Sequence, residues 1–228
     1  LRFENSGVLN FDAVSGGAVG TFSSYTATQV SLKSGVLDNA LDFSVDADGS
    51  TWGDTYLLLE DDDFNFRITP FTIAFFFQVT GGGEPNSGSE WGNLISILSK
   101  GTEDMYRIGH KNGGGVRFTI RHSTCTKPDT TSFTILDTLA TSTTYHFAMT
   151  FNCVKNAGNC DTATSTAEFF LDGNEIASCQ ISTRDFAGQA EKNFLIFGRL
   201  DTSGSTYDGE GWVDDLRIYD RVLSAQEI

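Results

Sequence analysis

Short apolar segments separated by glycine, asparagine, aspartate and serine recur along the whole chain. Thirteen of them have the length and the β-branched and aromatic content of strands, and no stretch shows the periodicity of a long helix. The pattern predicts an all-β fold, in which two antiparallel sheets pack face to face as a β-sandwich. The expected strands are 1–3, 40–43, 56–59, 71–79, 93–99, 105–110, 116–122, 131–136, 145–152, 167–171, 175–181, 194–198 and 211–219.

The chain is expected to form one domain, because 228 residues suit a single large β-sandwich and no linker divides them. The longest soft stretch, residues 81–92, lies between two expected strands and is interpreted as an insertion loop. The sequence begins without an initiator methionine or a signal peptide, so we expect a domain excised from a larger protein. No apolar run approaches the ~20 residues of a membrane-spanning helix, and no membrane insertion is expected.

The closing segment, residues 211–227, combines a strand pattern with a buried charge. It reads G-W-V-D-D-L-R-I-Y-D-R-V-L-S-A-Q-E, which predicts a strand followed by a short polar helix start. Trp212, Leu216 and Ile218 alternate with polar neighbours, and Asp214 falls on the same, buried side. Burying a lone carboxylate is costly, so Asp214 needs a partner. We expect a bound cation; the alternative is that Asp214 caps neighbouring backbone amides.

This closing segment resembles the last strand of LamG-like jelly-roll domains in the concanavalin A-like lectin/glucanase superfamily. Three further segments are similar to strands of that family and occur in the same order: 35–43 (G-V-L-D-N-A-L-D-F), 71–77 (F-T-I-A-F-F-F) and 169–177 (F-F-L-D-G-N-E-I-A). The resemblance spans essentially the whole chain. It implies a concanavalin A-like jelly roll and an extracellular, secreted or cell-surface location, whereas one fold hosts many functions.

The resemblance also implies a structural calcium site. In the wider superfamily the aspartate of the last strand often binds calcium together with backbone carbonyls from two other segments. Carried over to this chain, the ligands are Asp214, the carbonyl near Glu4 and the carbonyl of Asp38. Calcium accepts carboxylate and carbonyl oxygens alike. The family usually has glycine where Asp38 stands, and this departure either adds a carboxylate or disturbs the site.

The four cysteines are Cys125, Cys153, Cys160 and Cys179, and no C-x-x-C pair indicates a zinc ribbon. An even count in a domain of an extracellular family predicts disulfides. Cys153 and Cys160 flank a short segment between two expected antiparallel strands, which favours a Cys153–Cys160 bond and leaves Cys125–Cys179 as the second. The alternative is four reduced thiols in an intracellular protein.

A cationic cluster stands out in a chain whose net charge is −15. That charge argues against nucleic acid and anionic membranes as partners. Arg107, Arg117, Arg121 and His110 all lie in one expected hairpin, residues 105–122. If His110 faces Val116 across the turn, the three arginines share one sheet face. Arginine binds carboxylate or sulfate in bidentate fashion, which points to an acidic glycan. The alternative is that these arginines pair with acids across the sheet.

Other candidate ligand-binding residues lie in expected loops. The loop 199–211 brings together Asp201, Tyr207, Asp208 and Glu210, a set in which an aromatic ring can stack on a sugar while carboxylates accept its hydroxyls. Trp52 and Trp91 are placed in Gly/Ser-rich loops, where either serves as a stacking platform or anchors its own loop. A solvated turn is the alternative for residues 199–211.

Catalysis is not expected. The paired carboxylates of glycoside hydrolases, E-x-D-x-E on one strand, are absent, as are G-x-S-x-G and H-E-x-x-H. We therefore expect a non-catalytic, monomeric carbohydrate-binding module with a calcium site. The alternatives are a structural or protein-binding adhesion module, and a divergent polysaccharide lyase that uses the arginines with His110 and Tyr106.

Overall fold

The structure is a computed structural model of the chain. It describes residues 24–28, 31–37, 39–42, 56–61, 70–82, 91–99, 103–111, 116–120, 124–125, 133–134, 140–156, 159–161, 164–180, 193–198 and 209–228. These residues form strands and turns, with no helix in any of the described ranges. Within the same ranges no helix is long and apolar enough to cross a membrane.

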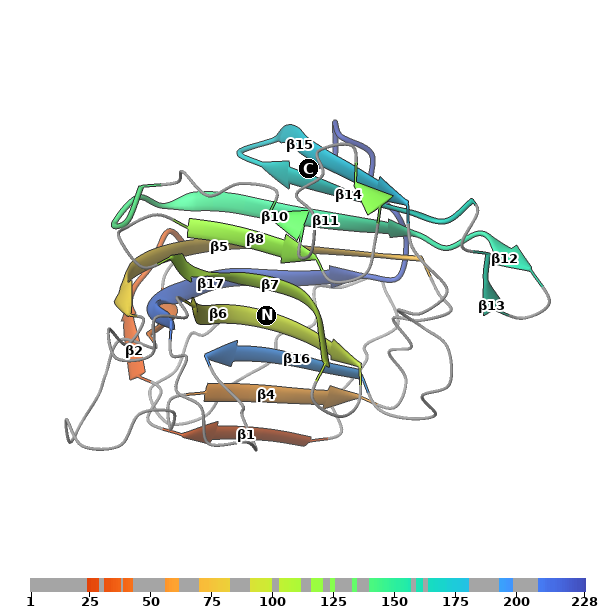
Figure 1. Cartoon of the computed structure of the whole chain (residues 1–228). Coiled ribbons are helices and arrows are strands. Elements are labelled where there is room, and N and C mark those ends of the chain that lie inside the picture. Colours follow the sequence, from red (N-terminus) through yellow and green to blue (C-terminus); the bar gives the residue numbers. More distant parts are fainter. Residues whose placement is uncertain are drawn as a thin grey trace.

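The strands form two large antiparallel sheets and one small one (Figure 1). In spatial order, the seven-stranded sheet contains β1 (Ser24–Thr28), β4 (Tyr56–Asp61), β16 (Asn193–Gly198), β6 (Trp91–Ser99), β7 (Glu103–Lys111), β8 (Val116–Ile120) and β10 (Phe133–Thr134). The eight-stranded sheet contains β2 (Ser31–Ser34), β3 (Asn39–Asp42), β17 (Gly209–Tyr219), β5 (Phe71–Gly82), β11 (Tyr145–Asn152), β14 (Thr166–Leu171), β15 (Asn174–Gln180) and β9 (Thr124–Cys125). The small sheet pairs β12 (Lys155–Asn156) with β13 (Asn159–Cys160). The predicted all-β sandwich is confirmed.

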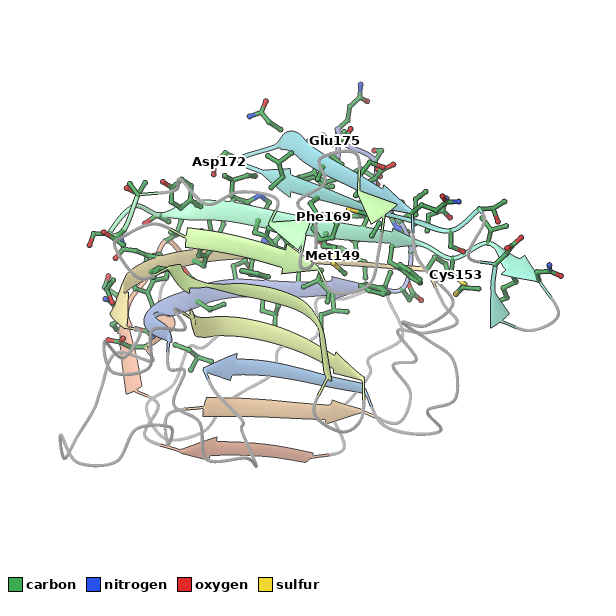
Figure 2. All side chains as sticks on the ribbon, in the orientation of Figure 1. Met149, Cys153, Phe169, Asp172 and Glu175 are labelled. Carbon is green, nitrogen blue, oxygen red and sulfur yellow. A yellow bond between two sulfur atoms is a disulfide. The ribbon has the colours of Figure 1, made fainter. Side chains whose placement is uncertain are left out.

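Aromatic residues on one face of the eight-stranded sheet build the core. Alternate residues of β5 point inward, and Phe71, Ile73, Phe75 and Phe77 are all buried. The rings of Phe75 and Phe147 lie 5.1 Å apart, on strands β5 and β11. Met149 and Phe169 are buried directly opposite each other on β11 and β14 (Figure 2). Strand β17 lies against β6 and β7, and β5 lies against β7, so this face packs on the seven-stranded sheet.

Most expected strands occur close to their predicted positions, and five strands were missed. The missed strands are β1, β2, β9, β12 and β13, of which β1 and β2 carry the short polar sequences S-Y-T-A-T and S-L-K-S. Such sequences lack the apolar alternation that predicts a strand, because edge strands bury little surface. The expected strand 1–3 lies outside the described residues.

The hairpin between β14 and β15 turns at Asp172-Gly173, as the sequence predicts. Both residues have positive φ, 48° for Asp172 and 75° for Gly173, which suits a two-residue hairpin turn. The Asp172 Oδ1 atom accepts a hydrogen bond from the backbone N–H of His146 at 2.8 Å, so the turn is tied to β11.

The placement of Trp91 in a loop is wrong. Trp91 is the first residue of β6 and pairs with Lys111 of β7. At the other end of the expected loop, Gly81 and Gly82 belong to β5 and pair with Glu210 and Gly209 of β17. Backbone pairing with long neighbouring strands therefore extends both strands into sequence that has turn composition.

The predicted burial of Trp212, Asp214 and Leu216 is confirmed, but the three do not share one face of β17, because the strand contains a β-bulge. The register shifts between Asp214 and Arg217, and Asp215 has a φ of 48°. Val213 faces the core opposite Phe77, and Leu216 is fully buried, whereas Asp214 lies on the opposite, outward face. The extra residue breaks the strict alternation on which the prediction relied.

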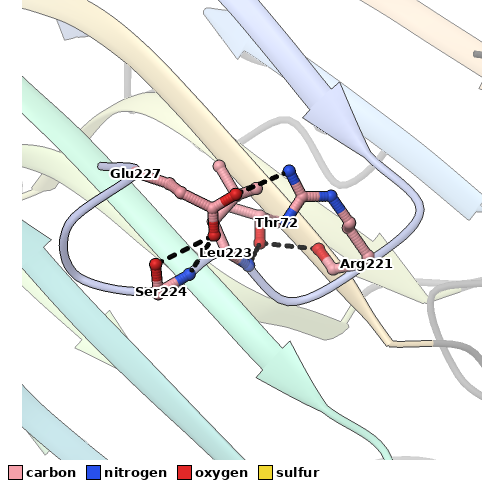
Figure 3. Close-up of polar contacts among 5 residues, drawn as sticks. All are labelled: Thr72, Arg221, Leu223, Ser224 and Glu227. Carbon is pink, nitrogen blue, oxygen red and sulfur yellow. Dashed lines mark hydrogen bonds and ion pairs between the residues drawn. The ribbon is translucent and has the colours of Figure 1, made fainter.

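The C-terminal segment, residues 220–228, folds back over the outward face of the eight-stranded sheet (Figure 3). The Thr72 hydroxyl donates to the Arg221 carbonyl at 2.8 Å and accepts from the Leu223 N–H at 2.9 Å. The Glu227 carboxylate accepts from the N–H and hydroxyl of Ser224, both at 2.9 Å, and pairs with Arg221 at 2.8 Å. The expected helix start is therefore a single turn, closed by its own side chains.

The predicted disulfide between Cys153 and Cys160 is confirmed, with a Cα–Cα distance of 5.1 Å. It closes the base of the β12–β13 hairpin, which projects from the ends of β11 and β14 (Figure 1). Cys179 is disulfide-bonded, and Cys125 is the residue opposite it in the β15–β9 ladder. This agrees with the predicted Cys125–Cys179 pairing.

Candidate functional site

The β7–β8 hairpin has the register that the sequence analysis expected. His110 pairs with Val116, and Arg107 pairs with Thr119. Directly opposed residues share a face, and residues two apart on one strand share it as well. Arg117 is opposite Gly109, so Arg107 and Arg117 belong to the same face. Arg121 lies outside the described residues.

His110 does not join that face. It alternates with Gly109 on a ladder that is regular from Tyr106 to His110, so it shares the opposite face with Ile108 and Phe118. This opposite face carries the apolar positions and is the one expected to pack on the eight-stranded sheet. The register thus separates His110 from the arginines with which it shares the hairpin.

Two further positions join the arginine face. Lys111 is two residues from Gly109, and Trp91 is directly opposite Lys111. Arg107 and Lys111 thus lie two residues to either side of Gly109 on β7, and Arg117 is directly opposite Gly109 on β8. Diagonal neighbours of this kind in an antiparallel ladder are typically ~7–8 Å apart along the backbone. A glycine within a strand leaves room for the close approach of another group. Lys111 was missed because its place on this face depends on the register.

Asp214 lies on the outward face of the eight-stranded sheet and is 1% exposed. Its Oδ2 atom accepts from the Leu37 N–H and its Oδ1 atom accepts from the Asp215 N–H, each at 2.7 Å. The Val36 backbone also donates to this carboxylate. Burial raises the pKa of Asp214. The three amide donors act to lower this pKa, whereas the nearby Asp215 carboxylate acts to raise it. The described partners of this carboxylate are therefore backbone amides.

These contacts leave a calcium ligand role untested. The other two expected ligand positions, Glu4 and Asp38, lie outside the described residues. Among the residues that the structure describes, no group of three or more His, Cys, Asp or Glu side chains is placed to hold a metal ion.

The remaining candidates lie in sequence that the structure does not describe. Asp201, Tyr207 and Asp208 of the expected lectin-like loop fall there, as does Trp52. Glu210, which was expected in the same loop, instead belongs to β17, where it pairs with Gly81 of β5.

Comparison with known families agrees with this architecture. Residues 48–228 match a laminin G family described as the concanavalin A-like lectin/glucanases superfamily. The chain belongs to this superfamily. The resemblance inferred from the strand motifs is therefore confirmed. No curated protein sequence matches the chain.

Solved structures with the same fold include proteins of several organisms. The binding domain of Paraclostridial Mosquitocidal Protein 1 is 16% identical with a TM-score of 0.58, over 90% of this chain and 45% of that chain. Trypanosoma rangeli sialidase in complex with sialic acid is 12% identical with a TM-score of 0.58, over 89% of this chain and 28% of that chain. The botulinum neurotoxin serotype D binding domain is 15% identical with a TM-score of 0.54, over 89% and 44%. This superfamily member thus spans less than half of each of these chains, and at such identities the likeness shows the fold alone.

Proposed function

We propose that this chain is a non-catalytic carbohydrate-binding module, and that its ligand is an acidic glycan bound on the outward face of the seven-stranded sheet. The observation that carries the proposal is the register of β6, β7 and β8. It groups Arg107, Lys111 and Arg117 around Gly109, with Trp91 beside Lys111. In a chain of net charge −15, such a group concentrates the potential that attracts an anion.

The chemistry of these residue types suits an acidic sugar. Guanidinium groups bind carboxylate or sulfate with two parallel hydrogen bonds, and an ammonium group adds a third cation. Gly109 has no side chain to block the approach of the anionic group, and the indole of a tryptophan offers an apolar surface to the sugar ring. Two structures of the same fold are binding domains, one of a mosquitocidal protein and one of a botulinum neurotoxin, and a binding role for this chain is in keeping with them.

An extracellular location fits the same proposal. Disulfides form and persist in oxidising compartments, and the Cys153–Cys160 bond closes an exposed hairpin.

The test is a titration of heparin (sulfated), polygalacturonate (carboxylated) and dextran (neutral) against the wild type and Arg117→Ala. The acidic polymers should bind, and dextran should not bind at this face. Binding of the acidic polymers should weaken as salt is added, because exposed charges are screened within ~8–10 Å. Arg117→Ala should weaken acidic binding without unfolding the sheet. Lys155→Ala, which removes one exposed cation on the β12 hairpin, is the matched control.

The same titration separates the other expectations. Binding that needs calcium, tolerates salt and falls with Tyr207→Ala would move the site to the loop 199–211. Appearance of unsaturated product, followed by ultraviolet absorbance, would reveal a lyase. The lyase alternative is weakened because Arg107 and His110 lie on opposite faces. No binding of any glycan would contradict the proposed function.

A protein-binding adhesion module remains the second candidate, and one observation favours it. Val36 and Leu37 are 46% and 39% exposed at the turn between β2 and β3, and the Asp214 carboxylate holds their amides. Two adjacent exposed aliphatic side chains on a fixed turn suit a contact with another protein.

A further inference from the structure

The outward face of the eight-stranded sheet is covered at two places. The C-terminal segment covers one part, where Ile228 packs on Ala74, Ala148 and Phe170. The turn before β3 covers another, where the Asp214 carboxylate is buried against the backbone of Leu37. Near both covers lie four partly or well exposed side chains of the same face, which we call the open strip: Phe76, His146, Arg217 and Tyr219.

Two rings form an uncharged floor in the open strip. Phe76 and His146 are directly opposite each other on β5 and β11, and their rings lie 4.8 Å apart at an interplanar angle of 51°. Burial lowers the pKa of His146, although the Asp172 and Asp215 carboxylates act to raise it; Arg217 acts to lower it further. The imidazole is therefore neutral at neutral pH, and the floor offers apolar ring surface to a ligand.

A single guanidinium is held in a fixed orientation beside this floor. The bulge in β17 places Asp215 so that its Oδ2 atom lies 2.7 Å from Nη2 of Arg217. Tyr219 makes a second side-chain hydrogen bond to the same guanidinium. The Asp215 side chain is 7% exposed, whereas that of Arg217 is 46% exposed. Arg217 is opposite Ala74, which lies two residues before Phe76 on β5, so Arg217 and Phe76 share the outward face of the sheet. The N–H groups of Arg217 that Asp215 and Tyr219 do not use are therefore available next to the rings.

A side-chain amide lies at the next position of β5 on this face. The Oε1 atom of Gln78 accepts from the indole N–H of Trp212 at 3.0 Å. Its Nε2 atom donates a long hydrogen bond, of 3.5 Å, to the Thr144 hydroxyl, and the second N–H of the amide remains able to donate to a ligand.

We propose that the open strip is a second carbohydrate-binding site, one that takes a single pyranose unit. The C–H face of the sugar packs on Phe76 and His146, because this buries apolar surface of both partners. The sugar oxygens accept hydrogen bonds from Arg217 and Gln78. Aromatic floors with a few fixed polar groups are the usual composition of small-ligand sites. The ligand needs no negative charge, since Asp215 already neutralises Arg217. A module with sites on both sheets would bind a branched or multivalent glycan more tightly than either site alone.

The experiment is an NMR titration of the 15N-labelled domain with methyl β-galactoside, methyl β-glucoside and methyl α-mannoside, each up to ~50 mM, because single sugars with millimolar dissociation constants gain only about 4 kcal/mol. At least one glycoside should shift the backbone amide signals of Phe76, His146 and Arg217 with saturation. Arg217→Gln should weaken this binding about tenfold, since it removes charged hydrogen-bond donors. Phe76→Leu should also weaken it, because the side chain stays apolar but loses the ring.

The matched control is Arg221→Gln. Arg221 is another exposed arginine near this face, paired with Glu227 in the C-terminal segment, and its loss should leave glycoside binding unchanged. Absence of saturable shifts at the open strip with all three glycosides would overturn the proposal, as would equal effects of Arg217→Gln and Arg221→Gln. Neither result bears on the arginine face of the seven-stranded sheet, whose binding of heparin is measured with Arg117→Ala.

Discussion

The Oδ2 atom of Asp214 accepts a hydrogen bond from the backbone N–H of Leu37 at 2.7 Å, which joins two residues 177 positions apart in the sequence. The contact fastens the turn between β2 and β3 to the bulge of β17. Gly35 makes it possible, since a Cβ atom at this position would lie 2.5 Å from Oδ2 and 3.0 Å from the Cβ of Ala40. The buried carboxylate, the glycine and the turn therefore form one unit.

Gly35→Ala should destabilise the domain. The added methyl group meets the Asp214 carboxylate and has to displace it from its amide donors, so a cost of about 1–3 kcal/mol is expected. Urea unfolding measures the loss. Ser34→Ala, at the exposed neighbouring position, should change stability by less than about 0.5 kcal/mol. Equal stability of the two variants would show that the turn relaxes freely.

Calcium should raise the melting temperature if Asp214 also binds a metal. A ligand that binds only the native state adds about 2.7 kcal/mol when its concentration is a hundred times its dissociation constant. EDTA should then lower the melting temperature of the wild type, and Asp214→Asn should abolish the difference between calcium and EDTA. If EDTA has no effect while Asp214→Asn still destabilises the domain, Asp214 serves only as an anchor for backbone amides.

Acid should loosen the C-terminal segment through Glu227. The Arg221 side chain, together with the Ser224 amide and hydroxyl, lowers the pKa of Glu227 from 4.5 to about 2. A folded-state pKa below the unfolded value means that the contribution is fully present above pH 4.5 and is lost as the pH falls toward 2. The stability difference between wild type and Glu227→Gln should therefore shrink over that window. The Leu223 amide donates a hydrogen bond to the Thr72 hydroxyl, so its hydrogen exchange measures local opening of the C-terminal segment.

If the stability difference between wild type and Glu227→Gln stays constant from neutral pH down to about pH 2, the role of Glu227 ionisation is contradicted. Lowering the pH acts on many carboxylates at once, and the paired comparison cancels those that the two proteins share. Salt should also reduce the difference, because Arg221 and Glu227 are solvent-exposed.

Both predicted disulfides should be present in the unreduced protein. Mass spectrometry should show two fewer hydrogens for each bond than in the reduced chain, and peptide mapping should pair Cys153 with Cys160. The double substitution Cys153→Ala with Cys160→Ala should cost about 2–3 kcal/mol, the amount expected for a short closed loop. Alkylation of all four cysteines without reductant would contradict the disulfides and, with them, the proposed extracellular location.

The sequence predicts long, apolar strands well and edge strands poorly. Strand β5 was found because it carries four phenylalanines together with aliphatic residues, whereas β1 and β2 have too few apolar residues to show a period. The Cys153–Cys160 bond was predictable because both cysteines lie at the ends of expected neighbouring strands. The paired positive φ angles of Asp172 and Gly173 follow from local turn chemistry.

The candidate sites show where alternation alone fails. His110 was grouped with the arginines by closeness in sequence, and a shift of one position on a strand sends it to the other face. Trp91 and Lys111 belong to the arginine face only because β6 pairs with β7 in one particular register. Asp214 was correctly expected to be buried, but it was placed on the same face as Leu216, because nothing in the residue pattern indicates the bulge at Asp215.

By itself, the sequence of this protein determined the β-sandwich, its superfamily and the existence of a cationic hairpin, since these follow from local hydrophobic period, strand motifs and charge. Only the tertiary structure decided which side chains meet. Cross-strand register places Arg117 opposite Gly109, and a single extra residue in β17 turns Asp214 toward Leu37 and Asp215 toward Arg217. Register and bulges are set by pairing between distant strands, and that pairing is a property of the packed sheets rather than of any one segment.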